Sequence, residues 1–231
     1  MTITLGLLCG MPGEREALAR GFAGYNNVMI FSGTDRLNLP NLVPPTVKRL
    51  VDMGLCGGLG PPWKVADVVC AMTLQHKTGK PTDWDSAWMR EAIHAAGMVG
   101  VVINAVPYYS DGLFDESNTI EQRATIYNRY DPKPQAMSDE TRFGEALAIS
   151  RFIEFGVIRS LSDDWTMTLP PAATGAIMNA DGSPNIAYLA VSLGKDPAQI
   201  PSLLSLEKDY QASIASLEAA ARAVAPVLAN I

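Results

Sequence analysis

The chain has 231 residues, of which 48% are apolar and 18% are charged, and its formal net charge is −6 at pH 7. This composition excludes an intrinsically disordered protein and predicts one globular domain that spans residues 1–231. An acidic chain without a basic run also excludes nucleic acid as the expected partner, because phosphate groups bind clustered lysine and arginine.

Membrane insertion is not expected either. No segment approaches the roughly 18 apolar residues that a membrane-spanning helix needs. The opening MTITLGLLCGMPGE has no basic residues ahead of its short apolar run, which indicates a strand and not a signal peptide. The three cysteines, Cys9, Cys56 and Cys70, each lie in an apolar stretch. We therefore expect buried free thiols in a cytoplasmic protein.

The first hundred residues alternate between apolar, β-branched segments and segments with helical spacing. Glycine and proline separate these segments and mark the expected ends of strands and helices. The predicted elements are strands over 2–9, 28–33 and 65–74, helices over 14–22, 46–53 and 84–96, and a glycine-rich loop over 54–63.

The second half continues the alternation. Its predicted elements are a strand over 98–109, a polar loop over 108–118, helices over 119–130 and 138–152, a strand over 155–162, a proline-bearing loop over 163–175, and helices in the last forty residues. Strands that alternate with helices predict a layered α/β fold with a largely parallel sheet.

Acidic residues follow or precede predicted elements at three places, GMPGE (10–14), MSDET (137–141) and SLSDD (160–164). In a parallel sheet, ligands bind beyond the carboxyl ends of the strands, so these acids are candidate site residues. Each also has a purely structural interpretation. Asp163 suits a turn or a helix N-cap, while Glu14 and Glu140 suit the first turn of a helix.

Several common catalytic sites are missing from the sequence. It contains no G-x-S-x-G motif and no Walker motif, and GLCGGLG does not match G-x-G-x-x-G. Two histidines and three cysteines without C-x-x-C spacing predict no metal site. Acid–base chemistry would then depend on carboxylates. Arg159, inside a predicted strand, is expected to neutralise a buried acid.

The order of the motifs resembles the purine nucleoside phosphorylase and nucleosidase superfamily. GLLCGMPGEREAL resembles its G-x-x-x-A-M-x-x-E opening, LCGGLGPPWKVADVV its A-G-G-L-x-P-x-x-K-x-G-D-V-V segment, and FGVIRSLSDDW its F-x-x-x-R-x-I-S-D segment. The resemblance implies a three-layer α/β/α fold with a central mixed, largely parallel sheet. It also implies that Glu14 activates water, Asp163 protonates the purine and Glu140 grips the ribose hydroxyls.

The remaining predicted substrate-binding residues come from the same motifs. They are Cys56 and Gly57 of the glycine-rich segment, Ser162 and Trp165 beside Asp163, and Ser138 and Asp139 before Glu140. Ser138-Asp139 replaces the family's Asp-Met pair. Either the floor under the sugar is polar here, or the register slips by one residue and Asp139 is the family's aspartate.

The tail of the chain is similar to the hopanoid-associated phosphorylase branch, which is thought to release adenine from adenosylhopane. The similar segment is SDDWTMTLPPAATGAIMNADGSPN with the helices after it. Leu55 stands where the wider superfamily usually has serine. The loss of that hydroxyl favours water over phosphate as the nucleophile, although Arg15, Arg36 and the glycine loops could still bind phosphate.

The resemblance thus implies cleavage of the N-glycosidic bond of a purine nucleoside, with adenine as the expected base. No cofactor is expected, and inorganic phosphate is the one candidate co-substrate. A homodimer is expected from the resemblance and the apolar share. Two alternatives stay open: a nucleoside-binding protein that has lost catalysis, and an α/β enzyme of unrelated chemistry.

Overall fold

The computed structural model describes residues 2–77, 80–97, 103–109, 117–138, 141–174, 179 and 183–231. Two predicted site residues, Asp139 and Glu140, lie outside the described residues, as does the side chain of Arg36.

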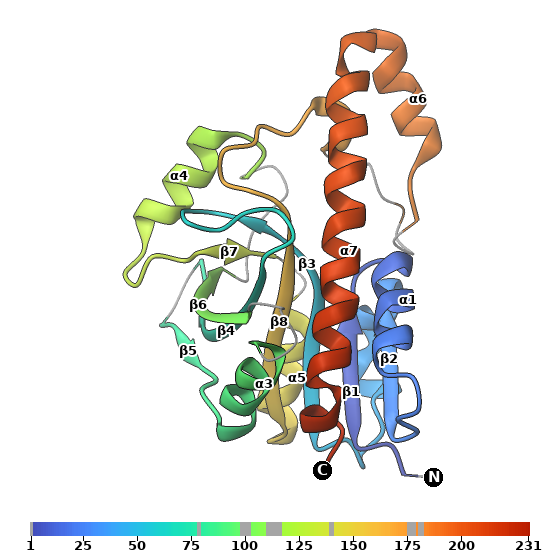
Figure 1. Ribbon diagram of the computed structural model, residues 1–231, viewed down its shortest axis with the longest axis vertical. Helices are drawn as coiled ribbons and strands as arrows, with labels where there is room; N and C mark the ends of the chain where they lie inside the picture. Colours follow the sequence, from blue (N-terminus) through green and yellow to red (C-terminus); the bar gives the residue numbers. More distant parts are fainter. Residues whose placement is uncertain are drawn as a thin grey trace.

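The described strands form one mixed sheet (Figure 1). They are β1 (Leu5–Cys9), β2 (Val28–Ser32), β3 (Arg49–Gly58), β4 (Val68–Gln75), β5 (Thr82–Asp83), β6 (Ile103–Tyr109), β7 (Ala136–Met137) and β8 (Glu154–Asp163). β1 lies between β2 and β3 and is parallel to both. β8 is parallel to β3 on one side and antiparallel to β4 on the other.

The strands β3, β8, β4, β6 and β7 close into a ring. β6 runs parallel to β4, and the short β7 pairs with β6 and then with β3. This closure, which the sequence did not predict, places Met137 of β7 directly opposite Gly57 of β3. The predicted central, largely parallel mixed sheet is confirmed.

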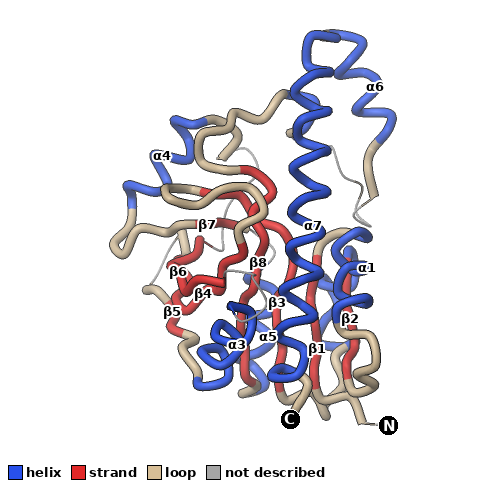
Figure 2. Tube along the Cα trace, viewed as in Figure 1, coloured by secondary structure: helices blue, strands red, loops and turns tan. Residues whose placement is uncertain are grey.

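Helices cover both faces of the sheet, as Figure 2 shows by colour, and the predicted three-layer α/β/α arrangement is confirmed. α1, α3 and α7 pack together over one face, and α5 with the short α2 covers the other. The described helices are α1 (Pro12–Gly21), α2 (Leu39–Leu42), α3 (Ala87–Gly97), α4 (Ile120–Arg129), α5 (Thr141–Arg151), α6 (Ile186–Lys195) and α7 (Ile200–Leu228), with 3-10 turns η1 (Gly33–Asn38), η3 (Pro171–Ala173) and η4 (Pro197–Gln199).

Successive side chains of β1 enter opposite layers of the core. Leu5, Leu7 and Cys9 pack toward α1 and α7, whereas Leu8 packs toward α5. A strand covered on both faces needs apolar residues at every position, which explains its unbroken apolar sequence. No helix among the described residues has the length and apolarity to cross a bilayer.

The predicted helix over 46–53 and the loop over 54–63 are wrong in part, because β3 spans Arg49–Gly58. The segment contains two charged residues, Arg49 and Asp52. In the structure both are buried, and each is paired with a carboxylate or guanidinium of β8. Ion pairing thus allows charged residues inside a central strand.

Candidate active site

Glu14 occupies the first turn of α1, and backbone N–H groups fix its carboxylate. Oε2 accepts hydrogen bonds from the N–H groups of Gly10 at 2.6 Å and Met11 at 2.8 Å. Oε1 accepts one from Leu55 of β3 at 2.6 Å. The first two contacts are those of a helix-capping acid, as the structural interpretation expected. The contact with Leu55 does more than cap the helix, because it joins α1 to β3 in the middle of the sheet.

Gly54 makes this junction sterically feasible. A Cβ atom at this position would lie 2.7 Å from Oε1 of Glu14 and 2.5 Å from Nη1 of Arg159. Only glycine leaves room for a carboxylate and a guanidinium against the same strand.

A buried network of polar side chains lies behind Glu14. Asp52 Oδ2 accepts from Arg159 Nη2 at 2.5 Å and from Thr141 Oγ1 at 2.6 Å. Arg159 Nη1 also donates to the carbonyl oxygen of Leu55 at 3.0 Å. The prediction that Arg159 neutralises a buried acid is confirmed. The network ties Thr141, the first residue of α5, to the strand segment that holds Glu14.

Asp52→Ala is expected to lower the free energy of unfolding by about 3–5 kcal/mol, because it removes the buried carboxylate that accepts from Arg159 Nη2 and from Thr141 Oγ1. Urea unfolding measures the change. Glu154→Ala is the matched control. Glu154 is 49% exposed. Without it, its partner Arg49 still donates hydrogen bonds to the carbonyl oxygens of Val227 and Leu228. We expect the control to cost less than about 1 kcal/mol. Equal losses in the two variants would contradict this account of the network.

Asp163 ends β8, and its side chain is 14% exposed. Oδ2 forms an ion pair with Nη2 of Arg123 at 2.5 Å, and Oδ1 accepts from the Ser162 hydroxyl at 2.7 Å. No helix begins at Asp163, so the structural interpretation as a helix N-cap does not apply. The predicted role of Asp163 as proton donor stays a prediction.

Arg123 is a further candidate site residue, which sequence reasoning missed. It lies on α4 and is only 2% exposed. Nε donates to the carbonyl of Ser117 at 2.9 Å, and Nη1 donates to those of Gly58 at 3.1 Å and Asp164 at 2.8 Å. The guanidinium is therefore held rigidly beside Asp163. In the sequence, Arg123 is one charged residue of an amphipathic helix, and no motif distinguishes it.

The two predicted catalytic carboxylates contact the same short piece of β3. Glu14 binds Leu55, and a Cβ atom at Gly57 would lie 3.1 Å from Oδ2 of Asp163. Two residues of a strand span about 7 Å. Cys56 lies between them, and burial raises the pKa of its thiol far above the usual range, so the thiol stays neutral. The structure thus brings Glu14, Cys56, Gly57 and Asp163 together.

Two further predicted site residues, Ser138 and Trp165, adjoin this segment or Asp163 along the chain. Ser138 follows Met137, which pairs with Gly57, and is half-buried. Trp165 is half-buried two residues after Asp163. Tyr210 of α7 also lies close to Glu14, and the sequence did not single it out. Its hydroxyl approaches Gly13 so closely that a Cβ atom there would lie 2.2 Å from it. Burial, and then the charge of Glu14, raises the pKa of Tyr210 and keeps its phenol neutral.

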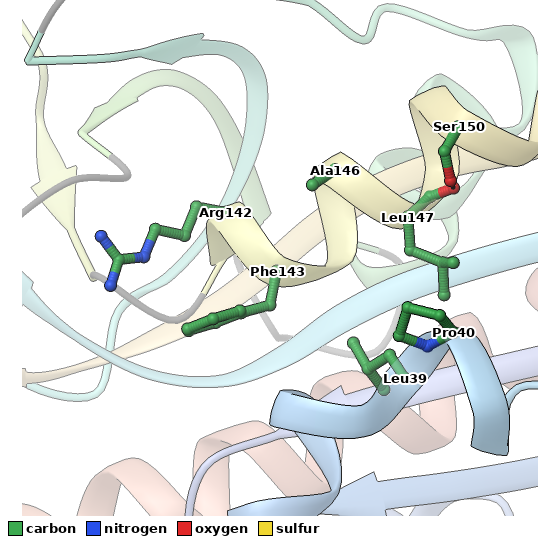
Figure 3. Close-up of a pocket in the computed structure, with 7 residues that line it drawn as sticks. All are labelled: Leu39, Pro40, Arg142, Phe143, Ala146, Leu147 and Ser150. Carbon is green, nitrogen blue, oxygen red and sulfur yellow. Dashed lines mark hydrogen bonds between the residues drawn. The ribbon is translucent and has the colours of Figure 1, made fainter.

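A hollow of about 510 Å³ lies between α2 and α5 (Figure 3). Arg142 is at one end and Ser150 at the other, and the walls are mainly apolar. A second hollow, of about 470 Å³, lies on α4. Neither is lined by Glu14 or Asp163. Within the described ranges, no three His, Cys, Asp or Glu residues are grouped to hold a metal ion.

Comparison with solved structures identifies the fold. A 5'-methylthioadenosine/S-adenosylhomocysteine nucleosidase from Neisseria meningitidis, solved with methylthio-immucillin-A, matches with a TM-score of 0.65 and 15% identity over 99% of both chains. Futalosine hydrolase of Helicobacter pylori matches with a TM-score of 0.62 and 16% identity over 95% of this chain and 97% of that one. The chain has the nucleosidase fold.

A third neighbour is the methylthioadenosine/S-adenosylhomocysteine nucleosidase of Helicobacter pylori with butyl-thio-DADMe-Immucillin-A. It matches with a TM-score of 0.61 and 15% identity over 95% of this chain and 98% of that one. No protein-family model and no curated protein sequence matches the chain. At this identity the similarity establishes the fold, and the activity has to be argued from the site.

Proposed function

We propose that the protein cleaves the N-glycosidic bond of a purine nucleoside, with adenine as the departing base. The observation that carries the proposal is that Glu14 and Asp163, which lie 149 positions apart in the sequence, both contact the segment from Leu55 to Gly57. The nucleosidase fold and the resemblance of the motifs that contain both residues support the same activity.

In the proposed reaction the bond between the anomeric carbon and the purine nitrogen breaks, and its electron pair leaves with the base. Glu14 takes a proton from the water that adds to the anomeric carbon. Asp163 contacts the departing base and supplies a proton to it as general acid. Glu140, which lies outside the described residues, is proposed to bind the ribose hydroxyls. Thr141, bonded to Asp52, would hold that neighbour in place.

Hydrolysis is the proposed form of the reaction, because Leu55 offers no hydroxyl to a phosphate ion and the buried Glu14 carboxylate would repel one. Adenosine should release adenine and free ribose at the same rate with and without added inorganic phosphate. Product analysis by liquid chromatography checks both. Strict dependence on phosphate, with a sugar phosphate as product, would establish phosphorolysis instead.

A nucleoside-binding protein without catalysis is the second candidate. The ion pair between Arg123 and Asp163 favours it, because the carboxylate is already occupied by a buried guanidinium. Tight adenosine binding in calorimetry, with no adenine released on long incubation, would support this second function.

We further propose that the substrate sugar carries a large apolar group, as in adenosylhopane. The hollow between α2 and α5 supports this, because it begins at Arg142 and Phe143, just after the predicted sugar-binding Glu140, and its walls are mainly apolar. A hollow of this size suits a small-molecule group.

Phe143→Ala is expected to raise the KM for an adenosine analogue with a long alkyl group on the sugar's far carbon, roughly tenfold or more, since a buried aromatic ring stabilises an apolar ligand by about 1.5–3 kcal/mol. The KM for adenosine itself should not change. Steady-state kinetics with both substrates tests this, and equal effects on both would remove the hollow from the substrate site.

A cytoplasmic location is also proposed. It is supported by the three cysteines, which are buried and form no disulfide bond, as predicted. Thiols persist in this form in a reducing compartment.

A further inference from the structure

Phe152, the residue that follows α5, is the most exposed large apolar side chain of the described residues, at 97%. Its φ angle is +54°, in the left-handed region. The position after a helix often takes this conformation, but glycine or asparagine usually occupies it, because a bulky side chain is strained there. Phe152 therefore combines a strained backbone with an apolar ring in water. Neither feature stabilises the fold, which indicates a function for the side chain.

Two further exposed apolar side chains lie near Phe152. Ile149 is 55% exposed on α5, and its carbonyl accepts from the N–H of Phe152 at 3.4 Å. Leu42, the last residue of α2, is 40% exposed. The Arg151 guanidinium donates to two carbonyl oxygens within 40–43, at 2.5 and 2.7 Å. These bonds hold α2 against the end of α5, so the three apolar side chains gather around that end.

The same surface is basic, although the chain has a net charge of −6. Segments 36–48 and 141–153 contain one acid, the buried Glu145, and four basic residues, Arg36, Lys48, Arg142 and Arg151. Lys48 lies beside the end of α5, because its carbonyl accepts from the N–H of Glu154 at 3.0 Å. Glu154 itself forms an ion pair with Arg49 at 2.8 Å. We call this surface the α5 face, made of apolar Leu42, Ile149 and Phe152 and basic Lys48, Arg142 and Arg151.

We propose that the α5 face docks on the surface of an anionic lipid bilayer, with the Phe152 ring entering the headgroup layer. Protein surfaces that lie on membranes combine lysine and arginine with exposed phenylalanine and aliphatic side chains. The basic residues bind the anionic headgroups, and the ring leaves water. Acidic residues on the far side of the protein do not prevent docking, because charges are screened beyond a Debye length of about 8 Å at physiological salt.

A second protein surface is a less suitable partner for the α5 face. A stable protein interface buries about 800 Å² on each side, whereas the α5 face exposes three large apolar side chains. Lysine is also depleted in protein interfaces, and Lys48 is exposed here. A bilayer needs no matching shape, so a single protruding ring with basic neighbours is sufficient for it.

The position of the α5 face extends the proposed function. The hollow between α2 and α5 ends at Ser150, which lies between Ile149 and Arg151 in the chain (Figure 3). A nucleoside whose sugar carries a large apolar group would reside in a bilayer, and docking would bring the hollow to it. This step alone rests on the proposed function. Docking itself requires no catalysis and is measured without substrate.

Flotation of the full chain with lipid vesicles tests the proposal. We expect the wild type to float with vesicles of phosphatidylcholine and phosphatidylglycerol. Its binding to phosphatidylcholine alone should be at least about tenfold weaker, because each basic residue near an anionic surface contributes roughly fivefold. Lys48→Glu should weaken binding to the mixed vesicles and leave binding to phosphatidylcholine unchanged.

Phe152→Asn separates docking from folding. Binding to the mixed vesicles should fall about tenfold, because the variant has no apolar ring to bury. The midpoint of thermal unfolding should rise by roughly 2–4 °C, because asparagine tolerates the left-handed conformation. Phe152→Leu should restore most of the binding. Leu204→Asn is the matched control, since Leu204 is 67% exposed on α7, away from the α5 face, and this variant should bind like the wild type.

Several results would overturn the proposal: a wild type that floats with neither kind of vesicle, equal binding to both kinds, or unchanged binding by Phe152→Asn. Self-association in sedimentation velocity that Phe152→Asn abolishes, without vesicle binding, would assign the α5 face to a second copy instead. Phe152→Asn should release adenine from adenosine at the wild-type rate. Failure to dock therefore leaves the proposed function intact, and a wild type that docks but releases no adenine would refute the proposed function alone.

Discussion

Asp163→Asn should lower the rate of adenine release from adenosine by about 10²–10⁴-fold, the range expected for loss of a general acid or of a charge that contacts the departing base. Asparagine keeps the shape of the side chain and can still accept the Ser162 hydroxyl, which donates to Oδ1 at 2.7 Å. It removes the negative charge that Arg123 binds. Single-turnover kinetics with saturating enzyme would measure the chemical step apart from binding.

Two controls separate chemistry from folding. Asp164→Asn changes the neighbouring carboxylate, which accepts from the N–H of Thr166 at 2.8 Å and can do so equally as an amide, so its rate should match the wild type. The midpoint of urea unfolding of Asp163→Asn should fall, because Arg123 is left with a weaker partner. If the folded variant retains a near-normal rate, Asp163 has no part in the reaction.

The pH dependence of the wild type distinguishes two roles for Asp163. A general acid has to be protonated at the start of the chemical step, so kcat would fall as the pH rises. A carboxylate that stays paired with Arg123 and only accepts a hydrogen bond from the base would instead lose activity as the pH falls. A fall in kcat at high pH that Asp163→Asn abolishes would therefore assign the proton donation to Asp163, whereas a fall at low pH is expected in either case, because Glu14 has to be deprotonated to act as a base.

The sequence predicts best those strands that are continuous apolar runs with clear ends. β1, β4 and β8 are apolar runs bounded by glycine, proline or acids, and the sequence places all three within a few residues. β3 was missed over its whole length, because its first half contains the charged residues Arg49 and Asp52 and its second half is rich in glycine. Only the tertiary pairing with Glu154 and Arg159 shows why charges are tolerated there.

The candidate site residues also divide into those that the sequence indicates and those that only tertiary contacts reveal. The sequence singles out Glu14 and Asp163 because each lies at a junction with glycine or serine in a recognisable order, and the structure brings both to the same segment of β3. Arg123 was not found, because its role depends on α4 reaching the end of β8, a contact between segments 40 positions apart. The position of Met137 against Gly57 likewise depends on closure of the strand ring, which no local pattern encodes.

Glu14→Gln should abolish most hydrolysis, with a fall in kcat of about 10²–10⁴-fold as expected for loss of a general base. The structure indicates that the same substitution also lowers the free energy of unfolding. Both oxygens of Glu14 accept from backbone N–H groups, so the amide NH2 of glutamine must face at least one donor. An unsatisfied buried donor costs about 1–3 kcal/mol. Thermal unfolding and kinetics on the same preparation measure the two effects.

Glu16→Gln on the same helix provides the matched control. Its side chain is 74% exposed and faces Arg20 at 3.8 Å, so neither kcat nor stability should change measurably. Glu14→Asp separates the two roles further, because it keeps the negative charge but withdraws it from Leu55 by one methylene. If Glu14 serves only to cap α1 and join it to β3, Glu14→Gln will lose stability while kcat of the folded fraction stays normal. A general base requires the loss of kcat to persist at temperatures far below the unfolding transition.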